Sequence, residues 1–258
     1  MAGKAASTGR NAGKAAAKLL GVERPVDSLH EGQKHPYRRP RDAATLIIVR
    51  QGKRAPEILL GCRDAAHAFM PNRYVFPGGR VDLADGHVPV GSGLRADVED
   101  RLLRAATPTR ARALAIAAIR ETFEETGLII GRKAKQPLDG PVDEAWRGFL
   151  DAGFAPALDA LDYIARAITP PGRPRRFNAR FFMADATSIA GGAIKSNGEL
   201  GDIRWVPLDE AQQLPVPTIT SLVLGEVARL IKEPPKRSRN RRIPLFKTVY
   251  GKHLLLQE

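Results

Sequence analysis

Three glutamates with helical spacing are the residues of this sequence best suited to chemistry. Glu121, Glu124 and Glu125 stand at positions i, i+3 and i+4, which share one face of an α-helix. Like charges at this spacing repel each other, and a hard divalent cation such as Mg²⁺ would offset the repulsion because it binds carboxylate oxygens. On spacing alone, a solvated face of an exposed helix is the simpler interpretation. The alternative is a metal site that acts on phosphate groups.

The opposite side of the same helix favours the metal site. Residues 109–126 contain no internal Gly or Pro, and Gly127 follows where a glycine commonly ends a helix. The apolar stripe that would pack on a core consists of Leu114, Ile116, Ala118, Ile119 and Phe123. A helix packed in this way holds its acids at one fixed edge. Arg120 lies next to Glu121 and at i−4 from Glu124, where it can bind a carboxylate by charge-assisted hydrogen bonds.

Two consecutive glycines form the second candidate element. Gly78 and Gly79 follow a short predicted strand, 74–76, which Pro77 is expected to end. Glycine allows a positive φ or a close approach of the backbone to another group. A Pro-Gly-Gly turn is common, so its significance here depends on the acid and the helix that follow it.

The elements that must position these residues are strands interrupted by helices. Further strands are predicted at 43–49, 57–61, 128–130, 163–169, 176–184 and 203–206, and further helices at 94–105, 141–161 and 217–231. This order, with adjacent hairpins, is typical of a mixed sheet between helical layers. The predicted fold class is therefore α/β.

The glycines, an acid and the helix together resemble the Nudix box, G-x5-E-x7-R-E-U-x-E-E-x-G-U. Gly79, Asp85 and the run 120–128 follow that pattern, with Asp85 in place of Glu and Thr122 in place of an aliphatic residue. The gap between Asp85 and Arg120 is 34 residues instead of seven. The peroxisomal coenzyme A and acyl-CoA diphosphatases have a similarly interrupted box. Residues 63–85, 118–130 and 169–177 are similar to theirs, and the likeness covers roughly 43–231.

The resemblance implies a Nudix-type α/β/α sandwich with a mixed sheet, spanning 42–231, and an insertion at about 86–108 that forms a surface excursion. It implies that Glu124 and Glu125 are the primary ligands of Mg²⁺ or Mn²⁺. Glu121 would be a third ligand or the base that activates water, and Arg120 would orient it. Either Asp85 or, as the alternative, Asp82 would fill the position of the first acid of the box.

Further residues are assigned by the same resemblance. Glu199 stands where many Nudix enzymes place a loop glutamate near the metals, although an ordinary turn residue fits equally well. Gly78 and Gly79 would line the substrate site. Arginines suit bidentate phosphate contacts, and Arg63 and Arg176 are the predicted substrate-binding pair. Surface charge is the other interpretation for them and for two neighbours, Arg173 and Arg175.

Composition limits the other classes of function. The chain has 258 residues and a single cysteine, Cys62, which excludes an internal disulfide framework and favours a reducing, cytoplasmic compartment. No apolar run is long enough to predict a membrane span. Residues 1–41 and 232–258 supply most of the net charge of +13 and are predicted to be basic tails. They allow nucleic-acid binding, and the acid-free start of the chain also fits an organellar transit peptide.

The function predicted from the sequence is metal-dependent hydrolysis of a diphosphate linkage in coenzyme A or an acyl-CoA. One alternative changes the substrate to a nucleoside diphosphate derivative or a dinucleotide. Another is a Nudix domain that serves as a ligand- or RNA-binding module. The presence of all three glutamates favours catalysis over the last alternative. The sequence gives no indication of the oligomeric state.

Overall fold

A computed structural model describes residues 36–64, 71–134, 144–249 and 252–258. Most of the predicted N-terminal tail therefore lies outside the described residues. Within them a nine-stranded sheet has the order β10-β2-β1-β8-β7-β11-β12, with β3 beside β2 and β4 beside β1. Its strands are β1 (Arg41–Gln51), β2 (Pro56–Arg63), β3 (Tyr74–Val75), β4 (Gly78–Arg80), β7 (Asp162–Ile168), β8 (Phe177–Asp185), β10 (Leu200–Pro207), β11 (Pro244–Val249) and β12 (Lys252–Gln257).

The main sheet is mixed, as predicted. The strand β1 runs parallel to β8 and antiparallel to β2, and β7 runs antiparallel to β8 but parallel to β11. A second sheet of three short strands has the order β6-β5-β9. Its strands are β5 (Ile129–Lys133), β6 (Phe154–Pro156) and β9 (Ile189–Gly191).

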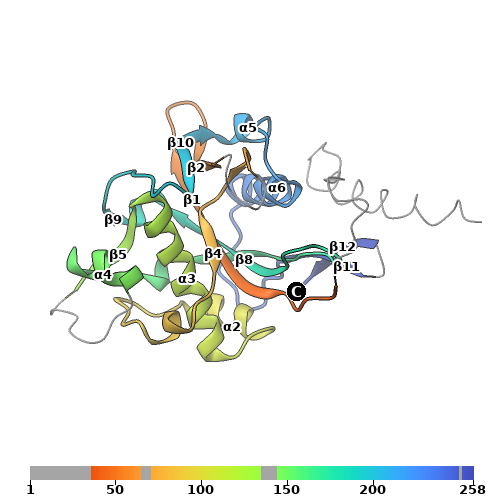
Figure 1. The fold of residues 1–258 in the computed structure, drawn as a ribbon, viewed down its shortest axis with the longest axis horizontal. Helices are drawn as coiled ribbons and strands as arrows, with labels where there is room; N and C mark the ends of the chain where they lie inside the picture. Colours follow the sequence, from red (N-terminus) through yellow and green to blue (C-terminus); the bar gives the residue numbers. More distant parts are fainter. Residues whose placement is uncertain (1–35, 65–70, 135–143, 250–251) are drawn as a thin grey trace, which may run out of the picture.

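Helices cover both faces of the main sheet (Figure 1). The helices are α2 (Ala96–Leu103), α3 (Pro108–Thr126), α4 (Glu144–Asp151), α5 (Leu208–Ala211) and α6 (Thr218–Lys232), with short 3-10 helices η1 (Leu83–His87), η2 (Leu158–Ala160) and η3 (Ala186–Ser188). Side chains alternate across β1, so that Leu46 and Ile48 pack in the core beneath α3 while Ile47 packs in the core beneath α6. The predicted α/β/α sandwich is confirmed.

Local sequence defines both ends of α3. Thr107 caps the N-terminus, where its hydroxyl accepts a hydrogen bond from the Arg110 amide, and Pro108 occupies the first turn. Gly127 ends the helix with a φ of 73°, in the left-handed region that favours glycine. The helix predicted at 109–126 is therefore confirmed, one residue longer at its start.

The insertion inside the box contributes to the core, which corrects the expectation of a surface excursion. Val88, Val98 and Leu102 are almost completely buried and belong to the core cluster beneath α3. The guanidinium of Arg101 is also buried, where it donates to Asp97 on its own helix and to Asp162 on β7. Because α2 is amphipathic, it covers the sheet with one face and meets solvent with the other.

The C-terminal segment is also part of the domain, and the predicted boundary at residue 231 is wrong. The strand β11 joins the sheet beside β7, with Leu245 opposite Arg166 and Phe246 opposite Ala167. Ile243 and Phe246 are buried. The many basic residues of this segment suggested a tail because their acidic partners lie elsewhere in the chain.

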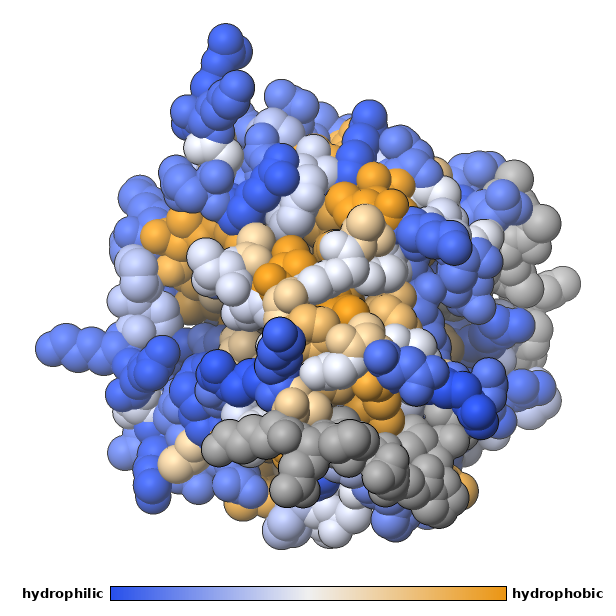
Figure 2. Space-filling view, turned by 90° about the vertical axis from the view of Figure 1, so that its left-hand side faces the viewer, coloured by the Kyte–Doolittle hydropathy of each residue, from blue (hydrophilic) through white to orange (hydrophobic). Residues whose placement is uncertain are grey.

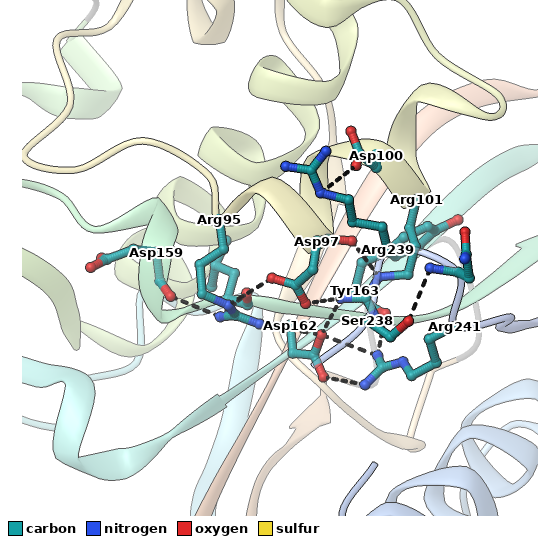
Figure 3. A network of polar contacts seen from close by, with 12 residues as sticks. Arg95, Asp97, Asp100, Arg101, Asp159, Asp162, Tyr163, Ser238, Arg239 and Arg241 are labelled. Atoms are coloured by element: carbon teal, nitrogen blue, oxygen red, sulfur yellow. Dashed lines mark hydrogen bonds and ion pairs between the residues drawn. The ribbon is translucent and has the colours of Figure 1, made fainter. Parts of the chain in front are cut away.

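One of those partners is Asp162, at the start of β7. Arg101 from α2 donates to it at 2.8 Å, and Arg241 from the C-terminal segment donates through two nitrogens at 2.9 and 3.1 Å. Figure 3 shows these arginines converging on the carboxylate, with Arg95 beside them. This network joins the insertion to the C-terminal segment. The sequence suggested that both parts are peripheral, but in the structure they stabilise each other.

The face at the left of Figure 1, near α4, β5 and β9, carries apolar surface among charged side chains (Figure 2). Phe123 of α3, Leu150 of α4 and Phe154 of β6 are partly buried against the core beneath α3. In the described ranges, no helix is both long enough and apolar enough to cross a membrane.

Candidate active site

The three glutamates lie along one edge of α3, beside the glycine strand β4. The side chain of Glu125 is 5% exposed, whereas Glu121 and Glu124 are partly exposed. The helix accommodates the polar Thr122 of the box because its hydroxyl donates to the Ala118 carbonyl at 2.8 Å. Thr122 therefore satisfies its own polar group in the core, at a position where the pattern has an aliphatic residue.

The two glycines bring the backbone against the acids. The Gly78 amide donates to Oε2 of Glu125 at 2.8 Å. A Cβ atom at Gly79 would lie 2.5 Å from the carboxyl group of Glu121, and one at Gly78 would lie 2.5 Å from the Ala44 carbonyl oxygen. No larger residue fits either position without movement. The pair lies on β4, which pairs with β1, so the segment expected to be a turn is a short strand.

Arg120 joins this edge to the insertion. Its guanidinium donates to Asp85 at 2.8 and 3.1 Å and to the Arg80 carbonyl oxygen at 2.8 Å, and it lies 3.0 Å from Glu121 and 3.1 Å from Glu124. Asp85 is buried, whereas Asp82 is mostly exposed and 3.7 Å from the guanidinium. The structure therefore places Asp85, rather than Asp82, against the arginine of the box.

The acids have raised pKa values. Burial raises the pKa of Glu121 to about 7, because the nearby Arg120 only partly offsets the loss of solvent. Burial raises the pKa of Glu125 to about 8, and the Gly78 amide only partly offsets it. Burial also raises the pKa of Glu124. The edge is thus a site where negative charge is costly and a cation is favoured.

Two residues from other elements lie close enough to this edge to affect it electrostatically. Arg63, at the end of β2, lowers the pKa of Glu125, and Glu199, just before β10, raises it. The pKa of Arg63 itself is lowered, chiefly by burial, and by the charge of Arg175, while Glu125 and Glu199 oppose the shift. Arg63 and Glu199 therefore lie within electrostatic range of Glu125, and their roles in substrate binding and catalysis stay predictions. The structure adds Arg175, which the sequence marked only as one of several nearby arginines.

Arg176 has a different environment. Its guanidinium donates to the Thr169 and Arg38 carbonyl oxygens, and it stacks over the Tyr37 ring at 5.1 Å. These contacts fix the start of β8 against the segment that leads into β1. Main-chain oxygens accept from Nε and Nη1 of Arg176, so these two groups hold the side chain in place, and its role in binding substrate stays a prediction.

The edge of α3 that carries Glu121, Glu124 and Glu125, here called the acid edge, suits a divalent cation in the type of its donor atoms. Among the described residues, no group of three or more His, Cys, Asp or Glu side chains is already arranged around one point. Mg²⁺ does not require such a group, because it is usually bound by one or two carboxylates together with water and substrate phosphates. Glu121 and Glu125 supply hard oxygen donors, and the absence of a side chain at Gly79 lets the carboxyl group of Glu121 approach the β4 backbone closely.

Comparisons with known proteins agree with this geometry, although no family model matches the chain. The acyl-coenzyme A diphosphatase NUDT19 of Gallus gallus is 27% identical over 233 residues, which cover 66% of this chain and 62% of the relative. A putative nudix hydrolase 7 of Caenorhabditis elegans is 28% identical over 152 residues, 55% of this chain and 43% of the relative. The chain therefore spans less than two thirds of the length of either protein.

A solved structure extends the agreement to the fold. The crystal structure of a NUDIX hydrolase from Alicyclobacillus acidocaldarius is 29% identical, with a TM-score of 0.55, and the match covers 74% of this chain and 92% of that one. This chain has a mixed sheet between two helical layers, with paired glycines against a glutamate-rich helix, and its fold is that of a Nudix-type α/β/α sandwich. The chain is therefore similar in sequence and in fold to Nudix hydrolases, and the Gallus gallus relative is named as a diphosphatase.

Proposed function

We propose that this protein is a metal-dependent hydrolase that cleaves the diphosphate linkage of coenzyme A or an acyl-CoA. The observation that carries the proposal is the contact of β4 with the acid edge of α3. The Gly78 amide holds Glu125 while Gly79 allows the carboxyl group of Glu121 to lie close to the β4 backbone, and both carboxyl groups have raised pKa values. Such a cluster of negative charge is unfavourable without a cation, which supports binding of a metal and its phosphate ligand over a solvated helix face.

The chain's own residues have distinct roles in this proposal. Glu121, Glu124 and Glu125 would hold Mg²⁺ or Mn²⁺, which supplies Lewis-acid stabilisation of charge on the diphosphate oxygens. Water attacks one phosphorus, the bridging P–O bond breaks, and the proton of the water passes to a carboxylate. In the alternative in which Glu124 and Glu125 are the ligands and Glu121 is the base, a pKa of about 7 suits Glu121 to accept that proton at neutral pH. Arg120 fixes the orientation of Glu121 at 3.0 Å.

Positive charge at the site supports a substrate with several phosphates. Arg63 and Arg175 influence each other electrostatically, and Arg63 also responds to Glu121, Glu125 and Glu199. Coenzyme A carries a 3′-phosphate in addition to its diphosphate, so it needs more positive charge than a plain dinucleotide does. The name of the Gallus gallus relative and the interrupted box support the same substrate. Hydrolysis would give a 4′-phosphopantetheine product and adenosine 3′,5′-bisphosphate.

A substrate panel tests this proposal. The purified protein is incubated with Mg²⁺ or Mn²⁺ and, separately, with coenzyme A, acyl-CoAs, 3′-dephospho-coenzyme A, ADP-ribose, NADH and a dinucleoside polyphosphate. We expect a higher kcat/KM for coenzyme A or an acyl-CoA than for the 3′-dephospho form. Equal values would remove the case for coenzyme A and favour a dinucleotide or nucleoside diphosphate derivative. RNA binding without cleavage of any substrate would support the binding-module alternative.

A further inference from the structure

The strand β10 contains an irregularity close to the candidate site. Leu200 pairs with Arg63 and Gly201 with Cys62, but the next pair joins Arg204 to Leu60. Two residues, Asp202 and Ile203, therefore stand opposite the single residue Gly61, which is a β-bulge. Asp202 adopts a φ of +39°, an uncommon backbone conformation that aspartate and asparagine tolerate better than most residues.

This bulge determines where Glu199 lies. Without the extra residue, the pairing beyond Arg204 would continue in the same register, and Glu199 would fall one position further along β2. A shift of one residue also reverses the face of the sheet to which each side chain points. With the bulge, Leu200 is buried over Gly61, and the Glu199 carbonyl accepts the Asp64 amide at 3.4 Å. The bulge thus brings Glu199 level with the end of β2, beside Arg63.

Three side chains hold the bulge; we call them the bulge clasp: Tyr74, Asp202 and Arg204. The Tyr74 hydroxyl donates a hydrogen bond to the Asp202 carboxylate and accepts one from Arg204 at 3.1 Å. The Arg204 guanidinium lies 3.5 Å from the same carboxylate and 5.2 Å from the centre of the Tyr74 ring. Tyr74 lies on β3, on the other side of β2 from β10, so its hydroxyl reaches across a strand to the bulge.

The clasp links two segments that carry site residues. Tyr74 precedes Gly78 by four residues, and the Gly78 amide binds Glu125. Asp202 follows Glu199 by three residues, and the charge of Glu199 acts on both Glu125 and Arg63. The Tyr74 amide is itself fixed by the Pro215 carbonyl oxygen at 3.1 Å. The bulge clasp therefore connects the segment that leads to Gly78 with the segment that follows Glu199.

We propose that the bulge clasp is a positioning device that fixes the register of β10 and thereby holds Glu199 at the metal and diphosphate site. Tyr74 and Asp202 act through Glu199 and do not touch the substrate. This inference rests on the proposed function for its kinetic consequence, but the register of β10 is a structural property that can be measured separately. The alternative is an ordinary surface cluster, since Asp202 and Arg204 are each half exposed.

Paired substitutions separate the two interpretations. Tyr74→Phe removes only the hydroxyl, and Asp202→Gly removes the carboxylate while keeping the unusual backbone conformation accessible. We expect each to lower kcat about tenfold with little change in KM. Asp202→Asn retains both the backbone preference and an acceptor for the Tyr74 hydroxyl, so this variant should keep most of the wild-type kcat. Tyr37→Phe is the matched control, because Tyr37 is 73% exposed and its ring contacts Arg176 instead of the bulge clasp.

Two readouts distinguish positioning from general destabilisation. In a Glu199→Gln background, Tyr74→Phe should cause almost no further loss of kcat, because the residue that it positions is already disabled. In amide hydrogen exchange, Tyr74→Phe should raise the exchange rate of the Asp64 amide severalfold while the amides of α3 keep their wild-type rates. If the wild type cleaves none of the substrates, the proposed function fails, and the exchange measurement still decides the role of the clasp.

Two results would overturn the inference. One is a wild-type exchange rate at Asp64 in both Tyr74→Phe and Asp202→Gly. The other is full kcat in those variants, or an equal loss of kcat with and without Glu199.

Discussion

At the residue scale, the site is defined by carboxyl groups whose charged forms the fold disfavours. The pKa values of Glu121, about 7, and Glu125, about 8, are raised in the folded state, so the free energy of unfolding depends on pH. The folded state holds protons that the unfolded state, with ordinary glutamate pKa values, releases at lower pH. The stability associated with these protons is present at acidic pH and is lost as the pH rises towards 7 to 8.

We therefore expect the metal-free protein to become less stable between about pH 5 and pH 8, by up to about 1.4 kcal/mol per pH unit for each carboxyl group. The measurement is the midpoint of thermal unfolding against pH in the presence of a chelator. Glu125→Gln should flatten the dependence, whereas Glu144→Gln, on an exposed part of α4, should leave it unchanged. A wild-type midpoint that rises steadily from pH 5 to pH 8 would contradict the assigned pKa directions.

The pairing of Arg120 with Asp85 makes a second prediction at this scale. Asp85→Asn removes the charge from the buried partner of a buried guanidinium, so the free energy of unfolding should fall by about 3 kcal/mol. Asp82→Asn is the control, because Asp82 is exposed and further from the guanidinium, and its effect should stay within about 0.5 kcal/mol. Denaturant unfolding measures both. Equal losses would mean that Asp85 is not the acid on which Arg120 depends.

At the element scale, β4 and α3 form the site by direct contact. Gly79→Ala would place a methyl group 2.5 Å from the carboxyl group of Glu121, so the strand or the acid must move. We expect the variant to fold but to lose at least about a hundredfold in kcat, because a small misplacement of a catalytic group has a large effect on rate. Gly93→Ala is the matched control, since a Cβ there meets no atom within 4 Å. Unchanged kcat in Gly79→Ala would refute the role of this contact.

The sequence predicted the elements with strong local signals. The apolar stripe of residues 109–126 and the glycine that follows them predicted α3, and β-branched residues predicted β1. The turn at Pro170-Pro171-Gly172 marked the strands on either side of it, which are β7 and β8. The bulge in β10 was not predictable, because it depends on a hydrogen bond between Tyr74 and Asp202, which are far apart in sequence. The short strand β4 was missed for a related reason, since its glycines suggested a turn until the pairing partner β1 was known.

At the scale of the whole molecule, the insertion and the C-terminal segment form one body with the catalytic fold. The sequence suggested that both segments are solvated surface, because local composition does not reveal the distant acidic partners of their basic residues. Arg241 pairs with Asp162, 79 positions away, and Ile243 joins the core cluster beneath α3. Charge compensation of this kind is non-local, so composition alone could not distinguish a tail from an edge of the sheet.

A chain that ends at residue 231 should therefore fail to fold stably, in contrast to the boundary predicted from the sequence. The truncation removes β11 and β12, uncovers β7 and leaves Asp162 without Arg241. Removal of residues 1–35 is the matched comparison and should leave the described contacts of the domain intact. Circular dichroism and thermal unfolding measure the difference. A stable, cooperatively unfolding 36–231 fragment would show that the C-terminal strands are dispensable.

The central claim is that the acid edge of α3 supports metal-dependent cleavage of a diphosphate. Its most direct test is the rate of product formation from the best substrate, with saturating Mg²⁺ or Mn²⁺. The rate is measured in the wild type, Glu125→Gln and Glu144→Gln. We predict a loss of at least about a hundredfold for Glu125→Gln and wild-type turnover for Glu144→Gln, with both variants folded. Near-wild-type turnover in folded Glu125→Gln would contradict the account.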